Sequence, residues 1–253
     1  VFFNMYKSAN PPLAGLAGID DTNVIAAETV DAFEVGAKNS LFDGRAIINI
    51  AAYYAKYYNY QANNPDLVAG VVTTRLTNAG TVSTKGFEVD AILRPARNVN
   101  ISGGFAYNDA QVVAFRLPAG GNPANIVAPG TPLPNAPKYK ASVGADWTIE
   151  TGNSFNVQLG TSLAYQSSQI YELTANLTTR AGTTVAGYSI VDVNASLVDV
   201  NDRWKITAHV KNLFDKSFAS SIISGGPGGS FRYIIPREAD RYVGITAQLN
   251  FGN

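Results

Sequence analysis

Ten segments of the chain alternate between apolar and polar residues, and this period of two limits what the chain can fold into more than any other feature. In the clearest segment Val99, Ile101 and Phe105 fall on one face, and Asn100 and Ser102 fall on the other. A period of two is that of a β-strand with one apolar face. The segments lie at about 1–7, 30–40, 44–60, 79–93, 97–108, 137–149, 153–166, 186–198, 203–215 and 239–251. The sequence therefore predicts an all-β chain.

The connections between these segments alternate in length. Short ones lie at 41–43, 95–97, 151–153 and 201–202, and long ones lie at 8–29, 61–78, 109–136, 167–185 and 216–238. Loops longer than about 12–15 residues are uncommon in compact soluble domains. Barrels of the bacterial outer membrane have short periplasmic turns and long extracellular loops. The pattern thus favours an antiparallel transmembrane β-barrel of about ten strands over a soluble β-sandwich that binds a ligand.

The phase of each segment predicts which side chains face lipid. The expected lipid-facing residues are Val143, Leu159, Leu197, Ile206 and Ile245, and the expected inward-facing residues are Lys140, Gln158, Asp192, Lys205 and Gln248. In the segment 44–60 we assign the even-numbered residues to lipid, because the odd-numbered set contains Asn49. Aromatic belts mark the edges of the membrane, so we expect a girdle from Tyr53, Tyr54, Tyr57, Tyr58, Tyr60, Phe105 and Tyr107. After Val210 the alternation breaks at Asn212, where we expect the strand to reach the interface.

Composition excludes several classes of function. Nineteen basic and nineteen acidic residues leave no net charge, whereas nucleic-acid-binding proteins carry a basic surface. The chain contains no cysteine. Its single histidine, His209, lies mid-strand on the polar face, where it suits hydrogen bonding in the wall rather than catalysis. The expected inward acidic residues are Glu34, Glu88, Asp90, Asp146 and Asp192. They come from different strands, so we expect no metal, cofactor or catalytic site.

Five stretches resemble TonB-dependent outer-membrane receptors. They are ETVDAFEVGAK at 28–38, TKGFEVD at 84–90, PNAPKY at 134–139, NLFDK at 212–216 and RYVGITAQLNF at 241–251. The resemblance implies a 22-stranded barrel around an N-terminal plug, of which residues 1–253 supply the C-terminal part. The plug, the TonB box and the first strands are absent from this sequence. Phe251 is followed by Gly252 and Asn253, whereas the family usually ends on the aromatic residue.

The resemblance also implies a function. Such receptors lie in the bacterial outer membrane and take up a scarce ligand, such as a siderophore, cobalamin or a glycan, with energy from the TonB complex acting on the plug. The implied partners are membrane lipid, the TonB complex, and a plug and N-terminal barrel portion from the same gene or a separate chain. Within loops 109–136 and 216–238, the expected ligand contacts are Arg116, Arg232, Tyr233 and Arg237.

The alternative is a self-closed ten-strand barrel enzyme of the protease or lipase type. It requires the first and last strands to pair with each other. We expect no such closure, because inward residues such as Ser102, Gly144 and Thr246 are too small to fill a narrow barrel.

Overall fold

One antiparallel sheet dominates the computed structural model, which describes residues 2–10, 25–68, 71–117, 121–225 and 229–251. Over these residues the sheet has ten strands in the order β1-β2-β3-β4-β5-β6-β7-β10-β11-β14. Their bounds are β1 Phe2–Asn10, β2 Glu28–Leu41, β3 Ala46–Val68, β4 Val71–Ala96, β5 Val99–Phe115, β6 Tyr139–Glu150, β7 Phe155–Gln166, β10 Tyr188–Asp199, β11 Trp204–Lys211 and β14 Tyr242–Leu249. All ten predicted strands are present, so the expected all-β fold is confirmed.

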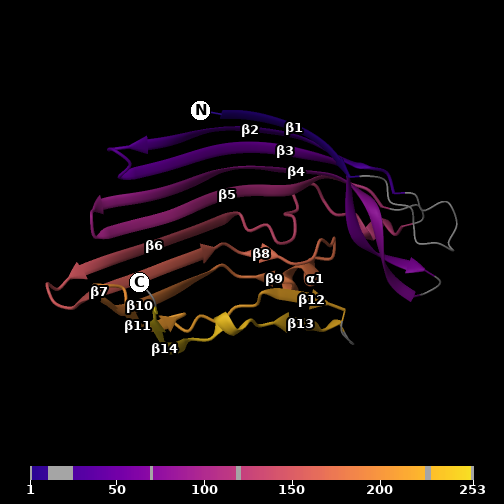
Figure 1. Ribbon diagram of the computed structural model, residues 1–253. Helices are drawn as coiled ribbons and strands as arrows, with labels where there is room; N and C mark the ends of the chain where they lie inside the picture. Colours follow the sequence, from indigo (N-terminus) through magenta and orange to yellow (C-terminus); the bar gives the residue numbers. More distant parts are fainter. Residues whose placement is uncertain (1, 11–24, 69–70, 118–120, 226–228, 252–253) are drawn as a thin grey trace.

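The two ends of the sheet differ, as the connection lengths predict (Figure 1). Short turns join β2 to β3, β4 to β5, β6 to β7 and β10 to β11 at one end. The connections at the other end hold small elements of their own. They are η2 (Pro123–Asn125), β8 (Gln169–Ile170), α1 (Leu177–Gly182), β9 (Thr184–Val185), β12 (Ser221–Ser224), β13 (Phe231–Ile234) and η4 (Arg237–Ala239). No described helix combines the length and the apolar character needed to cross a membrane.

One predicted long loop is wrong. We expected residues 61–78 to be irregular, but β3 and β4 continue as a paired hairpin to Val68 and Val71. Their register shifts around Asn59, which has a positive φ of 53°. Such a bulge bends a strand while its partner continues. The alternation ends here because the hairpin leaves the wall, as Figure 1 shows at the right, yet the backbone pairing persists.

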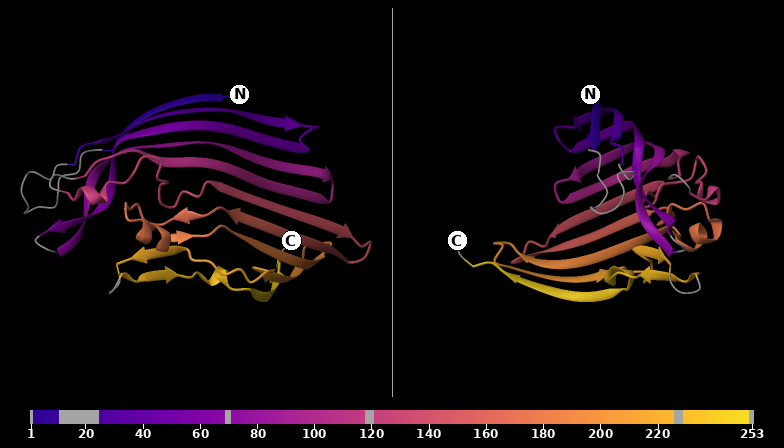
Figure 2. Two further views of the ribbon diagram at one scale, coloured as in Figure 1. Left: turned by 180° about the vertical axis from the view of Figure 1, so that it is seen from behind. Right: turned by 90° about the vertical axis from the view of Figure 1, so that its right-hand side faces the viewer.

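The sheet curves into an open arc (Figure 2). In the described part of the chain β1 and β14 stand at opposite ends of the strand order and do not pair with each other. The self-closed ten-strand barrel is therefore wrong, and the prediction that the chain does not close alone is confirmed. An arc of this kind forms part of the wall of a larger barrel.

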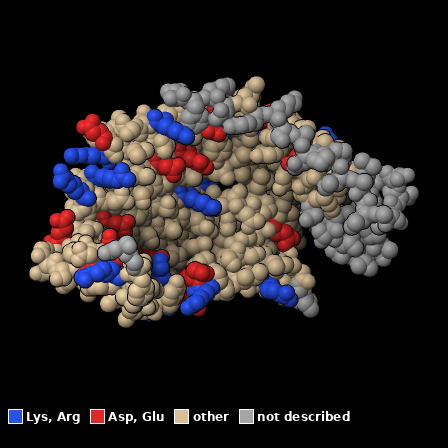
Figure 3. All heavy atoms as spheres, in the orientation of Figure 1, with Lys and Arg blue, Asp and Glu red and all other residues tan. Residues whose placement is uncertain are grey.

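The two faces of the wall follow the predicted phases. Val143, Leu159 and Ile245 lie on the outer face with exposed fractions of 49%, 39% and 76%. On the inner face the Lys205 ammonium donates to the Gln158 carboxamide oxygen at 3.0 Å. In the view of Figure 3, charges of both signs stand among wide uncharged areas. An apolar outer face and a polar inner face match a transmembrane barrel.

The expected tyrosine girdle is only partly right. The even-numbered Tyr54 and Tyr58 are exposed with the outer residues, as predicted. Tyr53 has the opposite phase, and its hydroxyl donates to the Asn108 side chain at 3.2 Å. A period of two sends neighbouring residues to opposite faces, so five clustered tyrosines cannot all belong to one girdle. The predicted Phe105 and Tyr107 on β5 do belong to the outer aromatic band, which Phe87 on β4 and Tyr139 on β6 extend.

A buried carboxylate organises the short turn after β10. Asp199 is 1% exposed, and it accepts hydrogen bonds from the backbone N–H groups of Asn201 and Arg203, each at 3.2 Å. The Arg203 guanidinium donates two further hydrogen bonds to the Asp199 carboxylate, at 2.7 and 2.9 Å. Asp202 in the same turn has a positive φ of 55°. The side chain of Asp199 thus holds both ends of the turn together.

This turn predicts an acid-sensitive contribution to stability. The Arg203 side-chain hydrogen bond lowers the pKa of Asp199 from 3.8 to about 2. A carboxyl group with a lowered pKa stabilises the fold above its ordinary pKa and loses that contribution as the pH falls toward the lowered value. We therefore expect Asp199→Asn to be less stable at neutral pH, and its folded fraction to change less between pH 4 and pH 2 than that of wild type.

The folded fraction at each pH is read from the heat-modifiable mobility of the protein on a semi-native gel. Asp43→Asn, which changes a carboxylate in the turn between β2 and β3, is the control. An Asp199→Asn variant with the pH profile of wild type would contradict the assigned role.

Candidate functional site

Three connections at the loop end pack into one unit, which we call the loop cap (residues 121–138, 167–187, 212–225 and 229–241). The Asn135 N–H donates to the Ile170 carbonyl at 3.0 Å, which joins the first connection to the second. The Tyr171 hydroxyl donates to the Ala219 carbonyl at 3.0 Å, which joins the second to the third. Ser224 also donates to Glu172. The cap is thus held by bonds between connections that are distant in sequence.

The loop cap has a small core of its own. Val127, Ile170 and Ile222 are all less than 9% exposed. Gly182 lies directly beneath the ring of Phe231, where any side chain on residue 182 would overlap the ring. Buried apolar contacts and crossing hydrogen bonds make a loop rigid before any ligand arrives, which reduces the entropy lost on binding. The cap is therefore a preformed surface.

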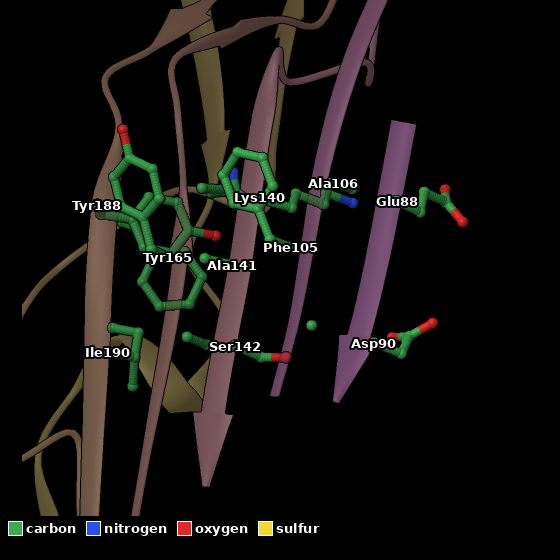
Figure 4. A pocket seen from close by; sticks show the side chains of 14 residues that line it. Glu88, Asp90, Phe105, Ala106, Lys140, Ala141, Ser142, Tyr165, Tyr188 and Ile190 are labelled. Atoms are coloured by element: carbon green, nitrogen blue, oxygen red, sulfur yellow. The ribbon is translucent and has the colours of Figure 1, made fainter. Parts of the chain in front are cut away.

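A hollow of about 520 Å³ lies on the inner face below the cap (Figure 4). The inner-face residues Glu88, Asp90, Lys140, Gln166 and Tyr188 line it. Phe218, from the connection after β11, also lines it and stacks on Tyr188 with ring centroids 4.3 Å apart. This volume falls in the range of small-molecule sites, about 300–1,000 Å³. The cap and the inner wall therefore meet at an aromatic pair above a charged hollow.

The four predicted contact residues occupy different parts of the loop end. Arg232 and Tyr233 are neighbours on β13, and both are exposed. Arg237 begins η4, with its guanidinium 5.1 Å from the centroid of the Tyr242 ring. Arg116 follows β5, and its N–H donates to the Ala79 carbonyl at 2.9 Å. Three of the four thus belong to the cap's last connection, whereas Arg116 stands beside the β3–β4 hairpin.

The NLFDK stretch, which the sequence predicts only as an interface segment, forms a turn around the buried side chain of Asn212. Asn212 is 2% exposed and has a positive φ of 50°. Its side-chain amide donates to the Lys216 and Glu238 carbonyls, each at 3.1 Å, and its oxygen accepts from the Lys216 N–H at 2.8 Å. The predicted end of β11 at residue 215 is therefore wrong, because this turn ends the strand at Lys211.

The same turn is tied to the inner wall. The Asp192 carboxylate accepts from the Asn212 N–H at 2.9 Å and pairs with the Lys211 ammonium at 2.9 Å. An inward acidic side chain is therefore paired with a basic one at this position. His209 lies over Gly244, with its ring edge-on to Tyr242 at 6.1 Å. Among the described residues, no three acidic or histidine side chains are grouped as metal ligands.

Comparison with known proteins identifies relatives over most of the chain. The family described as "TonB dependent receptor-like, beta-barrel" matches residues 2–213. A ferrichrome outer membrane transporter/phage receptor from Escherichia coli K12 is 28% identical over 204 residues, which are 79% of this chain and 24% of the relative. A metal-pseudopaline receptor from Pseudomonas aeruginosa is 25% identical over 186 residues, 74% of this chain and 23% of the relative. The chain thus spans about a quarter of the length of these relatives.

Solved structures share the fold at low sequence identity. The ferric yersiniabactin uptake receptor FyuA from Yersinia pestis has a TM-score of 0.74 and 17% identity, and the match covers 99% of this chain and 34% of that one. The siderophore receptor PiuA from Acinetobacter baumannii has a TM-score of 0.72 and 19% identity, with coverages of 97% and 32%. In both, this chain corresponds to about a third of the receptor.

Proposed function

Because the chain belongs to the TonB-dependent receptor β-barrel family, we propose that it forms the C-terminal ten strands of an outer-membrane receptor that imports a metal chelate of the siderophore class with energy from TonB. The family places the chain in the bacterial outer membrane. The related proteins are named as receptors and transporters, so the enzyme alternative is rejected.

The preformed loop cap is the observation that carries the proposal. It stands at the end of the wall that bears the long connections, and it presents Arg232 and Tyr233 from β13. Guanidinium groups bind planar anionic oxygens well, and tyrosine supplies a rigid amphipathic contact surface. Ferric chelates with carboxylate, catecholate or hydroxamate ligands present such oxygens. We therefore assign the first contact with ligand to Arg232, Tyr233 and Arg237, and an outer contact to Arg116.

The proposed mechanism has two stages. Ligand binds first at the cap and then passes the Tyr188–Phe218 pair into the charged hollow on the inner wall. In this proposal the plug fills the barrel and TonB acts on it from the periplasm. The open edges of β1 and β14 then pair with the barrel strands that complete the ring, because unpaired backbone groups in a bilayer each cost several kcal/mol.

Uptake of radioactive iron chelates by whole cells tests the function. The complete receptor is expressed in a strain that lacks its own ferric receptors, with and without TonB. We expect uptake that requires TonB, and we expect the double variant Arg232→Ala/Tyr233→Ala to bind the chelate at least tenfold more weakly, since two central contacts are worth about 1–2 kcal/mol each or more.

Arg97→Ala, at the opposite end of the wall, is the matched control and should bind as wild type does. Uptake that persists without TonB would refute the energy source. Unchanged affinity in the double variant, with normal TonB-dependent uptake, would refute only the contact residues.

A further inference from the structure

Two lysines flank one carboxylate on the outer face of the wall. Lys85 on β4 and Lys138, just before β6, lie 3.7 and 3.9 Å from the Asp109 carboxylate oxygens. The inner-face pair Lys211–Asp192 is much closer, at 2.9 Å. The side chains of Lys85 and Lys138 remain 55% and 52% exposed. The outer cluster is therefore loosely paired, and its two ammonium groups against one carboxylate leave one positive charge.

An aromatic band lies directly beside these lysines. The ring centroids of Phe87 and Tyr107 are 5.8 Å apart, and those of Tyr107 and Tyr139 are 5.4 Å apart. The Lys138 ammonium lies 5.7 Å from the centroid of the Tyr107 ring. Aromatic residues on the outer face of a barrel mark the boundary between hydrocarbon and headgroups. This boundary puts Lys85 and Lys138 at the level of the lipid headgroups on the loop side.

A polar hollow opens at the same place. It has a volume of about 450 Å³, and Asp109 and Lys138 line it together with Gln111, Ser168 and Gln169. These residues come from the end of β5, from the connection before β6 and from the start of the second connection of the loop cap. The hollow therefore supplies uncharged hydrogen-bonding groups beside the lysine pair.

We propose that Lys85, Lys138 and this hollow bind the phosphorylated headgroup of a lipid in the outer leaflet. The ammonium groups contact a phosphate, the amide and hydroxyl groups of the hollow contact the attached sugar or polyol, and the aromatic band packs against the first acyl segments. Asp109 keeps the two lysines apart while the site is empty. A lipid fits better than a soluble anion, because only a lipid also covers Phe87 and Tyr139, which are both 42% exposed. The proposed lipid site requires that the chain lies in the outer membrane, but it does not require that the receptor imports a metal chelate.

The test measures lipid binding by the complete receptor after exchange into a lipid-free detergent. Native mass spectrometry follows titration with a bis-phosphorylated glycolipid, with the same glycolipid after phosphatase treatment, and with phosphatidylethanolamine. We expect selective binding of the phosphorylated glycolipid, and an affinity about 30-fold lower in Lys85→Gln/Lys138→Gln, since each surface cation contributes roughly fivefold.

Lys216→Gln is the matched control, because Lys216 is an exposed lysine in the turn after β11 and does not line the hollow. It should bind like wild type, and heat-modifiable mobility should show that all variants are folded. Equal affinity in the double variant and wild type would overturn the site. Displacement of bound lipid by inorganic phosphate alone would also overturn it, since that outcome identifies a site for soluble anions.

Discussion

Leu159→Arg is expected to block assembly of the barrel in most molecules, whereas Ser162→Arg on the same strand is expected to assemble. Leu159 lies on the outer face near the middle of β7, which is paired on both sides, with β6 and β10. An arginine facing lipid costs about 2–4 kcal/mol near the bilayer midplane. That is a large part of the usual net stability of a protein, about 5–15 kcal/mol.

Ser162 is the matched control because it has the opposite phase. It is opposite Gly144 on β6 and Asp192 on β10, so an arginine there enters a polar interior with a carboxylate nearby. The folded fraction is measured in the outer-membrane preparation by heat-modifiable mobility. Equal losses in the two variants would contradict the assignment of faces.

Asn212→Ala is expected to lower the free energy of unfolding by about 3–5 kcal/mol, because a buried hydrogen-bonding group left without a partner costs about 1–3 kcal/mol. The substitution removes three hydrogen bonds and leaves the Lys216 N–H and the Lys216 and Glu238 carbonyls without their partner. Alanine also tolerates the positive φ poorly, at a cost of roughly 1–2 kcal/mol. The loss is measured by urea titration of the receptor in lipid vesicles.

Asn135→Ala separates the two contributions to this loss. Asn135 has a similar φ of 57° but is exposed. We expect this variant to lose only the backbone contribution, about 1–2 kcal/mol. If both variants lose the same free energy, the buried hydrogen bonds of Asn212 contribute nothing beyond its backbone conformation.

The sequence determined the strands and the faces of the wall, because both depend on a local rule. A strand that crosses a membrane must alternate at every step, so Val143 and Leu159 reveal their environment from their immediate neighbours alone. The positions of the short turns could also be predicted from the sequence, because the residues of a tight hairpin turn are adjacent in the chain.

Only the tertiary structure decided what lies beyond the membrane. There the alternation ends, so nothing local separates the β3–β4 hairpin from a loop. The same holds for the candidate sites. Asn212 bonds to Glu238, Tyr171 bonds to Ala219, and Lys85 and Lys138 both pair with Asp109. Such contacts depend on the register and packing of segments distant in sequence, which the periodicity of one strand does not encode.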